Sequence, residues 1–176
     1  MSQLRFRPAT KADIATLHGL VESAYRGTSA KAGWTHEADL LDGQRTDAEE
    51  LTDIVADPRR QILLGLDGDD LAGCVCVESK DGGRAYLGML TVDPQRQAGG
   101  LGRQLIAAAE NLARSQFGAE VMEMTVIAQR AELIAYYERR GYALTSEARP
   151  FPLHDPRFGE AKRDDLYFVV MEKALV

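Results

Sequence analysis

Apolar residues recur along the chain at two spacings, one typical of strands and the other of helices. Residues 4–7 alternate between apolar and polar, which predicts a short first strand. From Ile14 to Tyr25 the apolar positions follow helical spacing, and we expect the first helix there. A second helix is predicted over Asp47–Ala56, because Pro58 disfavours helical backbone in the residue before it.

Three apolar runs joined by short turns follow these helices. The runs are Gln61–Leu66, Leu71–Glu78 and Ala85–Val92. The turns between them, Asp67-Gly68-Asp69 and Asp81-Gly82-Gly83, consist of residues that favour tight turns. Turns this short connect antiparallel neighbours, so the runs predict a three-stranded meander.

Beyond Val92 the pattern changes from a period of two to helical spacing. A helix is expected from about Gly100, followed by a strand, a second helix and two closing strands. These last elements are predicted at Glu120–Ile127, at Ala131–Arg140 with Gly141 as its stop, near Tyr142–Thr145 and at Leu166–Glu172. The order β-α-α-β-β-β-α-β-α-β-β predicts one α/β domain over residues 1–176, with a mixed sheet and helices on both faces.

Composition narrows the class of protein. Of 176 residues, 45% are hydrophobic and 27% are charged, as in an ordinary soluble globular domain. The formal net charge of −6 argues against binding along nucleic-acid phosphates, which basic surfaces favour. Eight acids and one base lie between Thr35 and Asp57, so this segment alone carries −7.

The N-terminal residues hold no apolar signal-peptide core, and no apolar run approaches the roughly 20 residues that span a bilayer. We therefore expect a cytoplasmic protein without a membrane segment. Cys74 and Cys76 lie two apart in a predicted strand, a spacing that disfavours a disulfide between them. No His or acid beside them completes a zinc pattern, so we expect two buried thiols and no metal site.

A glycine-rich turn, Val92–Arg103, joins the third meander strand to the following helix. Helix N-termini present N–H groups without intrahelical partners, and glycines let a bulky anion approach the backbone, so the turn is suited to a phosphate. A Walker A loop would need Lys-Ser/Thr where Arg103-Gln104 stands. A Rossmann fingerprint would need a different glycine spacing and a parallel sheet. A plain connecting turn remains the alternative without a ligand.

The pattern Val-x-Pro-x-x-Gln-x-x-Gly-x-Gly resembles the acyl-CoA pyrophosphate loop of the GNAT superfamily of N-acyltransferases. The matching residues are Val92, Pro94, Gln97, Gly100 and Gly102. The resemblance implies a mostly antiparallel central sheet whose middle strands splay apart, with acetyl-CoA bound in the gap as cosubstrate. It assigns CoA binding largely to the backbone of the following residues: Leu90, Thr91, Val92, Gln97, Ala98, Gly99, Gly100, Leu101, Gly102 and Arg103.

A second segment resembles the same superfamily. Tyr137, four residues before Gly141, matches the tyrosine whose hydroxyl reaches the CoA sulfur and protonates the departing thiolate. Tyr136 is a competing candidate on another side of the helix. Gln129 stands eight residues before Tyr137, where many members have Asn, and its longer amide is expected to meet the cofactor.

The resemblance implies direct attack by a neutral amine, with a backbone N–H, expected to be that of Val92, polarising the thioester carbonyl. A route through Cys74 or Cys76 is disfavoured, because nothing near them lowers a thiol pKa. Many members place a Glu on the strand before the loop, but Ala85–Val92 contains no acid. Our candidate base is Glu123; Glu78, and Glu37 with His36, are alternatives.

Trp34 and Glu37 are the expected amine-binding residues, because the loop after the first helix often walls the acceptor site in relatives and an aromatic ring beside acids suits a cation. The long loop Arg149–Arg163 is expected to cover the acceptor or to support a homodimer. The function predicted is an acetyl-CoA-dependent N-acetyltransferase acting on a small-molecule or peptide amine. A catalytically silent CoA-binding module and a nucleotide-binding protein are the alternatives.

Overall fold

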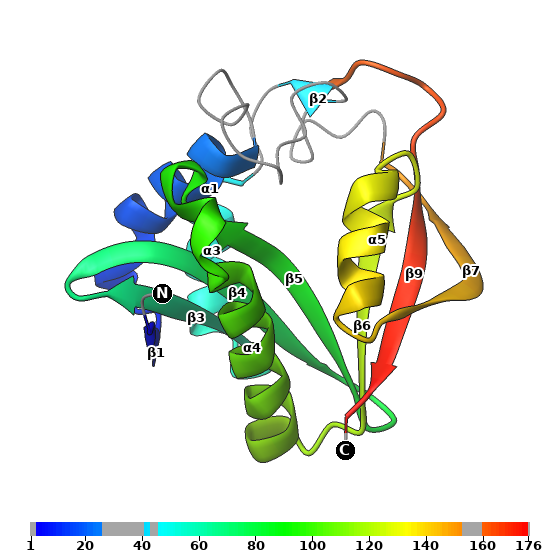
Figure 1. Cartoon of the computed structure of the whole chain (residues 1–176). Helices are drawn as coiled ribbons and strands as arrows, with labels where there is room; N and C mark the ends of the chain where they lie inside the picture. Colours follow the sequence, from blue (N-terminus) through cyan, green and yellow to red (C-terminus); the bar gives the residue numbers. More distant parts are fainter. Residues whose placement is uncertain (1–2, 26–40, 43–45, 153–159, 176) are drawn as a thin grey trace.

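A seven-stranded sheet with the order β1-β3-β4-β5-β6-β9-β7 forms the centre of the protein (Figure 1). The computed structural model describes residues 3–25, 41–42, 46–152 and 160–175. The sheet strands are β1 (Arg5–Pro8), β3 (Arg60–Asp67), β4 (Asp70–Lys80), β5 (Arg84–Val92), β6 (Val121–Ile127), β7 (Ala143–Pro150) and β9 (Tyr167–Ala174). Two short strands, β2 (Leu41–Asp42) and β8 (Glu160–Ala161), pair with each other.

The helices are α1 (Ile14–Tyr25), α3 (Ala48–Ala56), α4 (Leu101–Phe117) and α5 (Ala131–Arg139), with 3-10 turns η1 (Lys11–Asp13) and η2 (Pro94–Gly99). All neighbouring strands of the main sheet are antiparallel except β5 and β6, which are parallel. The predicted fold class, a mixed and mostly antiparallel sheet with splayed middle strands, is therefore confirmed.

Alternating residues of the meander build a core on each face of the sheet. Leu63, Val75 and Val77 pack with α4 and α5 in one cluster. Their neighbours along the strands, including Ile62 and Cys76, pack with α1 and α3 in a second cluster. A period of two places successive side chains on opposite faces, so each strand contributes to both cores. The helices thus cover both faces, as predicted.

A bulge in β5 changes which residues face α4. Cys74 pairs with Thr91 whereas Cys76 pairs with Gly88, so β5 holds one extra residue between them. Met89 has φ 53°, a left-handed backbone that non-glycine residues rarely adopt. Its side chain turns into the α1/α3 core, and Leu90 returns to the α4 side.

Immediately after this bulge, β5 runs alone along the gap to β6. The two strands pair only at Arg84–Val121, Ala85–Met122 and Tyr86–Glu123. Beyond that point β5 stays with β4 as far as Val92, whereas β6 stays with β9 as far as Ile127. The strands therefore diverge into the V-shaped opening between β5 and β6 seen in Figure 1, here called the splay.

Candidate active site

The glycine-rich turn lies at the open end of the splay. Asp93 caps η2 by accepting a hydrogen bond from the Gln95 N–H at 3.0 Å. Gly100 has φ 72°, a left-handed conformation that glycine adopts without a Cβ clash, and it caps α4. The first hydrogen bond of α4 runs from the Gln104 N–H to the Gly100 carbonyl at 3.3 Å. The amides of residues 101–103 precede this bond and occupy the first turn, where N–H groups lack intrahelical acceptors.

The arginine within the turn fixes the turn to the meander. The Arg96 guanidinium lies 2.9 Å from Asp67 and 3.3 Å from Asp70, which flank the β3–β4 turn. It also lies 3.7 Å from Asp93. Its charge is therefore already balanced by acids on the protein, whereas Arg103 is exposed on α4.

Tyr136 reaches from α5 across the splay to the first turn of α4. Its hydroxyl lies 2.7 Å from the point that a Cβ on Gly102 would occupy, and Val92 Cγ2 lies 3.8 Å from the same point. The Arg140 guanidinium stacks over the Tyr136 ring at 4.7 Å. Sequence reasoning considered Tyr136 only as a substitute for Tyr137. No sequence signal indicated its contact with Gly102, because the two residues are distant along the chain.

Tyr137 is a buried residue of the α4/α5 core, with 6% of its surface exposed. Its ring makes edge contacts with Tyr136 at 5.5 Å and Tyr142 at 6.1 Å between centroids. Burial raises the pKa of the Tyr137 phenol well above its ordinary value, and the nearby Tyr25 and Tyr136 raise it further. The phenol is thus protonated at neutral pH and is a potential proton donor.

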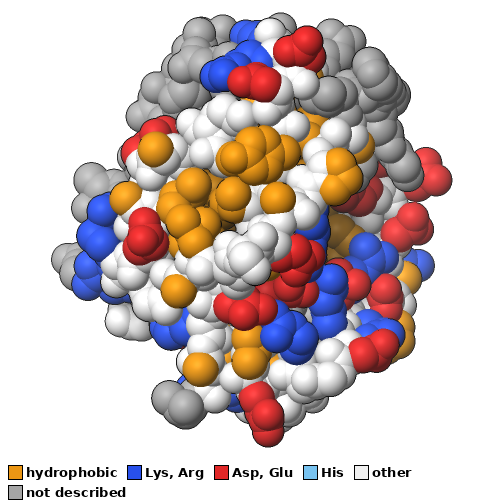
Figure 2. Space-filling view, turned by 90° about the vertical axis from the view of Figure 1, so that its right-hand side faces the viewer, with side chains coloured by type: hydrophobic (Ala, Val, Ile, Leu, Met, Phe, Trp, Pro, Cys, Tyr) orange, Lys and Arg blue, Asp and Glu red, His pale blue; other side chains and the backbone are white. Residues whose placement is uncertain are grey.

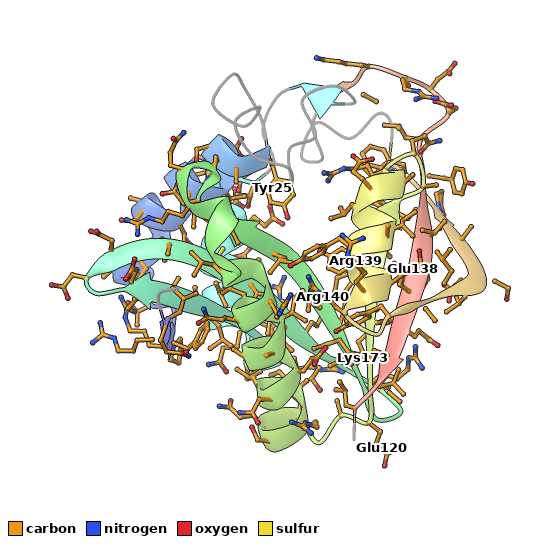
Figure 3. All side chains as sticks on the ribbon, viewed as in Figure 1. Tyr25, Glu120, Glu138, Arg139, Arg140 and Lys173 are labelled. Atoms are coloured by element: carbon orange, nitrogen blue, oxygen red, sulfur yellow. The ribbon has the colours of Figure 1, made fainter. Side chains whose placement is uncertain are left out.

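Tyr25 approaches β5 from the opposite face. Its hydroxyl, at the end of α1, donates a hydrogen bond to the Leu90 carbonyl beside the bulge. Figure 3 shows Tyr25 beside β5 and Arg140 extending from α5 toward α4. The Leu90 carbonyl keeps a second lone pair for another donor.

Gln129 follows β6 at the start of the turn into α5. Its side-chain N–H donates to the Asp165 carbonyl at 2.8 Å. Its Oε1 atom is buried and has no hydrogen-bond partner among the described residues. A buried acceptor without a donor is costly, so this amide is suited to an N–H group of a ligand. The contact between Gln129 and the cofactor stays a prediction.

Glu123 lies at the closed end of the splay, opposite Tyr86, and is 4% exposed. Its carboxylate is 3.1 Å from Arg149, 3.4 Å from Lys80 and 3.7 Å from Arg84. We call these four residues the Glu123 ion cluster. On the face of the molecule that carries β7 and β9, acidic and basic side chains are interleaved (Figure 2).

Two hydroxyl groups bridge β5 and β6 beside this cluster. The Tyr86 hydroxyl and Thr125 Oγ1 are 2.5 Å apart. Thr125 and Glu123 are two residues apart on β6 and thus share a face of the strand. The hydroxyl pair therefore lies on the side of Glu123 that leads to the open part of the splay.

The remaining predicted residues divide into three groups. Cys74 and Cys76 are buried free thiols, and burial raises the pKa of Cys76 to about 12, so the thiolate form is negligible at neutral pH. Glu78 lies on β4, where it is opposite Arg60 of β3 and Tyr86 of β5. Trp34, His36 and Glu37, the expected acceptor residues, lie outside the described residues.

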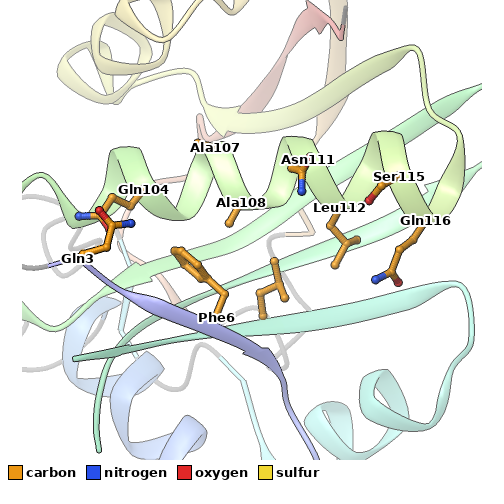
Figure 4. A pocket seen from close by; sticks show the side chains of 10 residues that line it. Gln3, Phe6, Gln104, Ala107, Ala108, Asn111, Leu112, Ser115 and Gln116 are labelled. Carbon is orange, nitrogen blue, oxygen red and sulfur yellow. The ribbon is translucent and has the colours of Figure 1, made fainter. Parts of the chain in front are cut away.

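A separate groove of about 490 Å³ lies between β1 and the outer side of α4 (Figure 4). Amide side chains line it, including Gln3, Gln104, Asn111 and Gln116, above the apolar residue Phe6. Gln104 is already engaged, because its Oε1 accepts the Leu4 N–H at 2.9 Å. The groove contains none of the residues predicted for the site.

Within the part of the chain that the structure describes, no three His, Cys, Asp or Glu side chains gather as a metal site. No described helix has both the length and the apolar character needed to cross a membrane.

Comparisons with known proteins agree with this geometry. A profile of the Acetyltransferase (GNAT) family matches residues 21–142. The ribosomal-protein-S18-alanine N-acetyltransferase of Escherichia coli superimposes with a TM-score of 0.71 at 15% identity, covering 98% of this chain and 94% of that one. A spermidine N-acetyltransferase SpeG chimera from Vibrio cholerae and hSSAT gives 0.70 at 16% identity, with 99% and 96% covered.

Salmonella typhimurium yncA, solved with its cofactor acetyl-CoA, superimposes with a TM-score of 0.67 at 22% identity, covering 98% of this chain and 94% of that one. At these identities the three structures establish the fold. A search of curated proteins finds no match.

Proposed function

Because the chain belongs to the GNAT acetyltransferase family, we propose that it transfers an acetyl group from acetyl-CoA to the nitrogen of a primary amine. The observation that carries this proposal is the splay itself, which has the first turn of α4 at its open end; the buried Tyr137 packs in the core that includes Leu90 and Val92 of β5. Acetyl-CoA, when bound, supplies an acetyl group already activated as a thioester.

Backbone groups on two elements support the binding of CoA. The Asp93 N–H donates to the Ala72 carbonyl on β4 at 2.9 Å. Consecutive N–H groups of a strand point to opposite sides, so the Val92 N–H is directed toward the splay. We assign this N–H to polarisation of the thioester carbonyl. The first-turn amides of α4 and the helix dipole favour the negative charge of a diphosphate.

Tyr137 is our candidate general acid. Its phenol is kept protonated by burial, which is the form that can donate a proton. As the amine nitrogen bonds to the acetyl carbon and the carbon–sulfur bond breaks, Tyr137 donates a proton to the departing sulfur. The proton that the amine nitrogen releases is returned to the phenol through the base and solvent, so the products are an amide and free CoA thiol. The high pKa of the Cys76 thiol argues against an acetyl-cysteine route.

Glu123 remains our candidate base, acting through the two hydroxyls beside it. Thr125 and Tyr86 form a hydrogen-bonded pair between Glu123 and the open part of the splay. Such a pair can pass the proton of an attacking ammonium or amine to the Glu123 carboxylate. The three cations of the Glu123 ion cluster hold the carboxylate in this position.

The acidic segment 35–57 is our candidate for attracting a cationic acceptor, with Trp34 immediately before it and Glu37 near its start. Its described part also has local roles. Asp47 caps α3 by accepting the Glu50 N–H at 2.7 Å, and Asp57 lies 2.9 Å from Arg60. Acids in the first turn of a helix also complement its dipole. The proposed attraction therefore rests mainly on residues before Asp47.

Two measurements test the proposed function. Thermal unfolding should shift upward with acetyl-CoA but not with ATP or NAD, because only the former fits both the splay and the glycine turn. Thiol release from acetyl-CoA should then rise when a primary amine from a panel of polyamines, amino acids and peptides is added. A CoA-induced shift without thiol release for any amine would favour the silent CoA-binding module; a shift with ATP or NAD alone would favour a nucleotide-binding protein.

Glu123→Gln tests the candidate base, with Glu172→Gln as its control. Glu172 is opposite Glu123 in the register of β6 and β9 and pairs with Arg84, so both variants disturb the same charges. Glu123→Gln should lower kcat by about a hundredfold or more, as expected for loss of a general base, and Glu172→Gln should retain the wild-type kcat within about twofold. A wild-type kcat in Glu123→Gln, or an equal loss in both variants, would assign this residue to structure alone.

A further inference from the structure

The α5 side of the splay carries a tyrosine and an arginine that pack against each other beside the first turn of α4. Tyr136 extends from α5 until its hydroxyl meets the first turn of α4 at Gly102. This places the phenol O–H against the first turn of α4, the turn whose amides are assigned to the CoA diphosphate. The contact joins the two helices across the mouth of the splay.

Arg140 lies behind this phenol and holds it in place. Its guanidinium stacks on the Tyr136 ring at 4.7 Å, a distance typical of a cation–π contact. Its Nε atom is buried, and no described residue accepts a hydrogen bond from it. A buried guanidinium nitrogen without an acceptor is costly, so an anionic ligand would satisfy it.

The end of α5 that carries Arg140 is firmly attached to α4. Lys173 donates to the Arg140 carbonyl at 3.0 Å and pairs with Glu110 of α4 at 3.0 Å. The Tyr142 hydroxyl donates to the same Glu110 carboxylate at 2.9 Å. The position of Arg140 relative to α4 is thus set by three polar contacts, which favours a preorganised site.

The charge around the first turn of α4 also favours a cation beside a bound diphosphate. The first turn of α4 contains no acidic residue and one exposed base, Arg103, and the guanidinium of Arg96 is already balanced by Asp67 and Asp70. The first-turn amides supply only partial positive charge. A diphosphate bound there would carry more negative charge than the backbone alone compensates.

We propose that Tyr136 and Arg140 form the α5 half of a diphosphate site, facing the first-turn amides of α4. The ligand class is a diphosphate ester of the CoA type, and the proposal rests on the proposed function. Tyr136 donates one hydrogen bond to a phosphate oxygen, and Arg140 supplies the full positive charge. Both residues bind the cosubstrate and take no part in proton transfer.

Calorimetric titration with CoA tests this site without any turnover. Tyr136→Phe and Arg140→Gln should each raise the Kd for CoA by about tenfold or more, as expected for a hydrogen bond to a charged group. Matched controls are Arg139→Gln, on the next residue of the same helix, and Tyr167→Phe, which removes an exposed hydroxyl. Both controls should keep the wild-type Kd within about twofold.

A phosphate-free probe identifies the part of the ligand that is recognised. S-acetylpantetheine should bind the wild type and Tyr136→Phe equally, because it lacks the diphosphate. Equal losses for CoA and S-acetylpantetheine, unchanged CoA binding in both variants, or an equal loss in Arg139→Gln would each overturn the proposal. A wild-type chain that does not bind CoA would instead refute the proposed function itself.

Discussion

The Tyr136 hydroxyl lies 2.7 Å from the point that a Cβ on Gly102 would occupy. Gly102 does not belong to the glycines with positive φ, whereas Gly100, two residues earlier, has φ 72°. Gly100 is thus required for backbone conformation, and Gly102 is required for space. The two glycines of this motif are therefore needed for different physical reasons. Gly102 is needed because Tyr136 of α5 occupies the space beside it.

This contact predicts that Gly102→Ala changes the free energy of unfolding in opposite directions in the wild type and in Tyr136→Phe. In the wild type, Gly102→Ala should lower the free energy of unfolding by about 1–3 kcal/mol, because the methyl group collides with the Tyr136 hydroxyl. In Tyr136→Phe the nearest ring atom is Cζ, 3.8 Å away, so the methyl fits. There the same substitution should be neutral or stabilise by up to about 1 kcal/mol through helix propensity.

Chemical denaturation of the four proteins of this cycle measures the effect without ligand. Gly118→Ala, at the left-handed C-cap of α4, is a useful comparison, since its Cβ meets nothing within 4 Å and its cost is conformational. That cost should be the same in both backgrounds. Equal effects of Gly102→Ala in both backgrounds would contradict the contact between Tyr136 and Gly102.

Tyr137→Phe should lower kcat by at least about tenfold while leaving the Kd for acetyl-CoA unchanged, as expected for a proton donor. The raised pKa of Tyr137 gives a second expectation. Because this phenol loses its proton only well above its ordinary value of about 10, it should produce no alkaline limb in the wild-type kcat below about pH 10. Steady-state kinetics across pH check both. Wild-type turnover in Tyr137→Phe at every pH would exclude this assignment.

Neither cysteine should carry the acetyl group. The Cys76 thiol has its pKa raised to about 12 by burial, and Cys74 is buried beside it. Intact-protein mass spectrometry after incubation with acetyl-CoA should detect no acetylated enzyme, and iodoacetamide should leave activity intact under native conditions. An acetyl group recovered on the peptide that contains residues 74 and 76 would show a covalent intermediate instead.

The ionised Asp13 carboxylate should make the free energy of unfolding depend on pH. The Arg7 guanidinium, 2.9 Å away, holds the pKa of the Asp13 carboxyl well below its usual range, and the Thr10 N–H, which donates to the same carboxylate at 2.8 Å, acts in the same direction. A lowered pKa adds stability above the unfolded-state value near 4, and this stability is lost as the pH falls. Asp13→Asn should therefore cost about 1 kcal/mol at pH 7, less below about pH 4. A cost that does not change with pH would contradict the ionic contribution.

Periodicity alone was enough to predict the order of the main elements, because each helix and strand buries one regular set of positions. It was also enough to place the turn from β5 into α4, where glycine and proline restrict the backbone. The pattern predicts a strand only near Tyr142–Thr145, whereas β7 continues to Pro150. This strand lies at the edge of the sheet and is largely exposed, so it has no apolar alternation to reveal it.

Features that depend on contacts between distant residues could not be predicted. The bulge at Met89 is invisible in a run of apolar residues, although it decides that Leu90 and Val92 face α4. The residues of the Glu123 ion cluster come from several strands. The sequence alone therefore shows Glu123 only as an isolated acid on one face of a strand. The role of Tyr136 likewise depends on the crossing of α4 and α5, which local spacing does not determine.

The most direct test of the account is a calorimetric titration of acetyl-CoA into the wild type, Gly100→Glu and Gly118→Glu. Both glycines are left-handed, with φ 72° and 62°, so the two variants carry a similar conformational cost at opposite ends of α4. We predict that the wild type and Gly118→Glu bind acetyl-CoA and that Gly100→Glu, with a carboxylate beside the first-turn amides, does not. A wild type that fails to bind, or wild-type affinity in Gly100→Glu, would contradict the claim that the glycine turn at the splay holds acetyl-CoA.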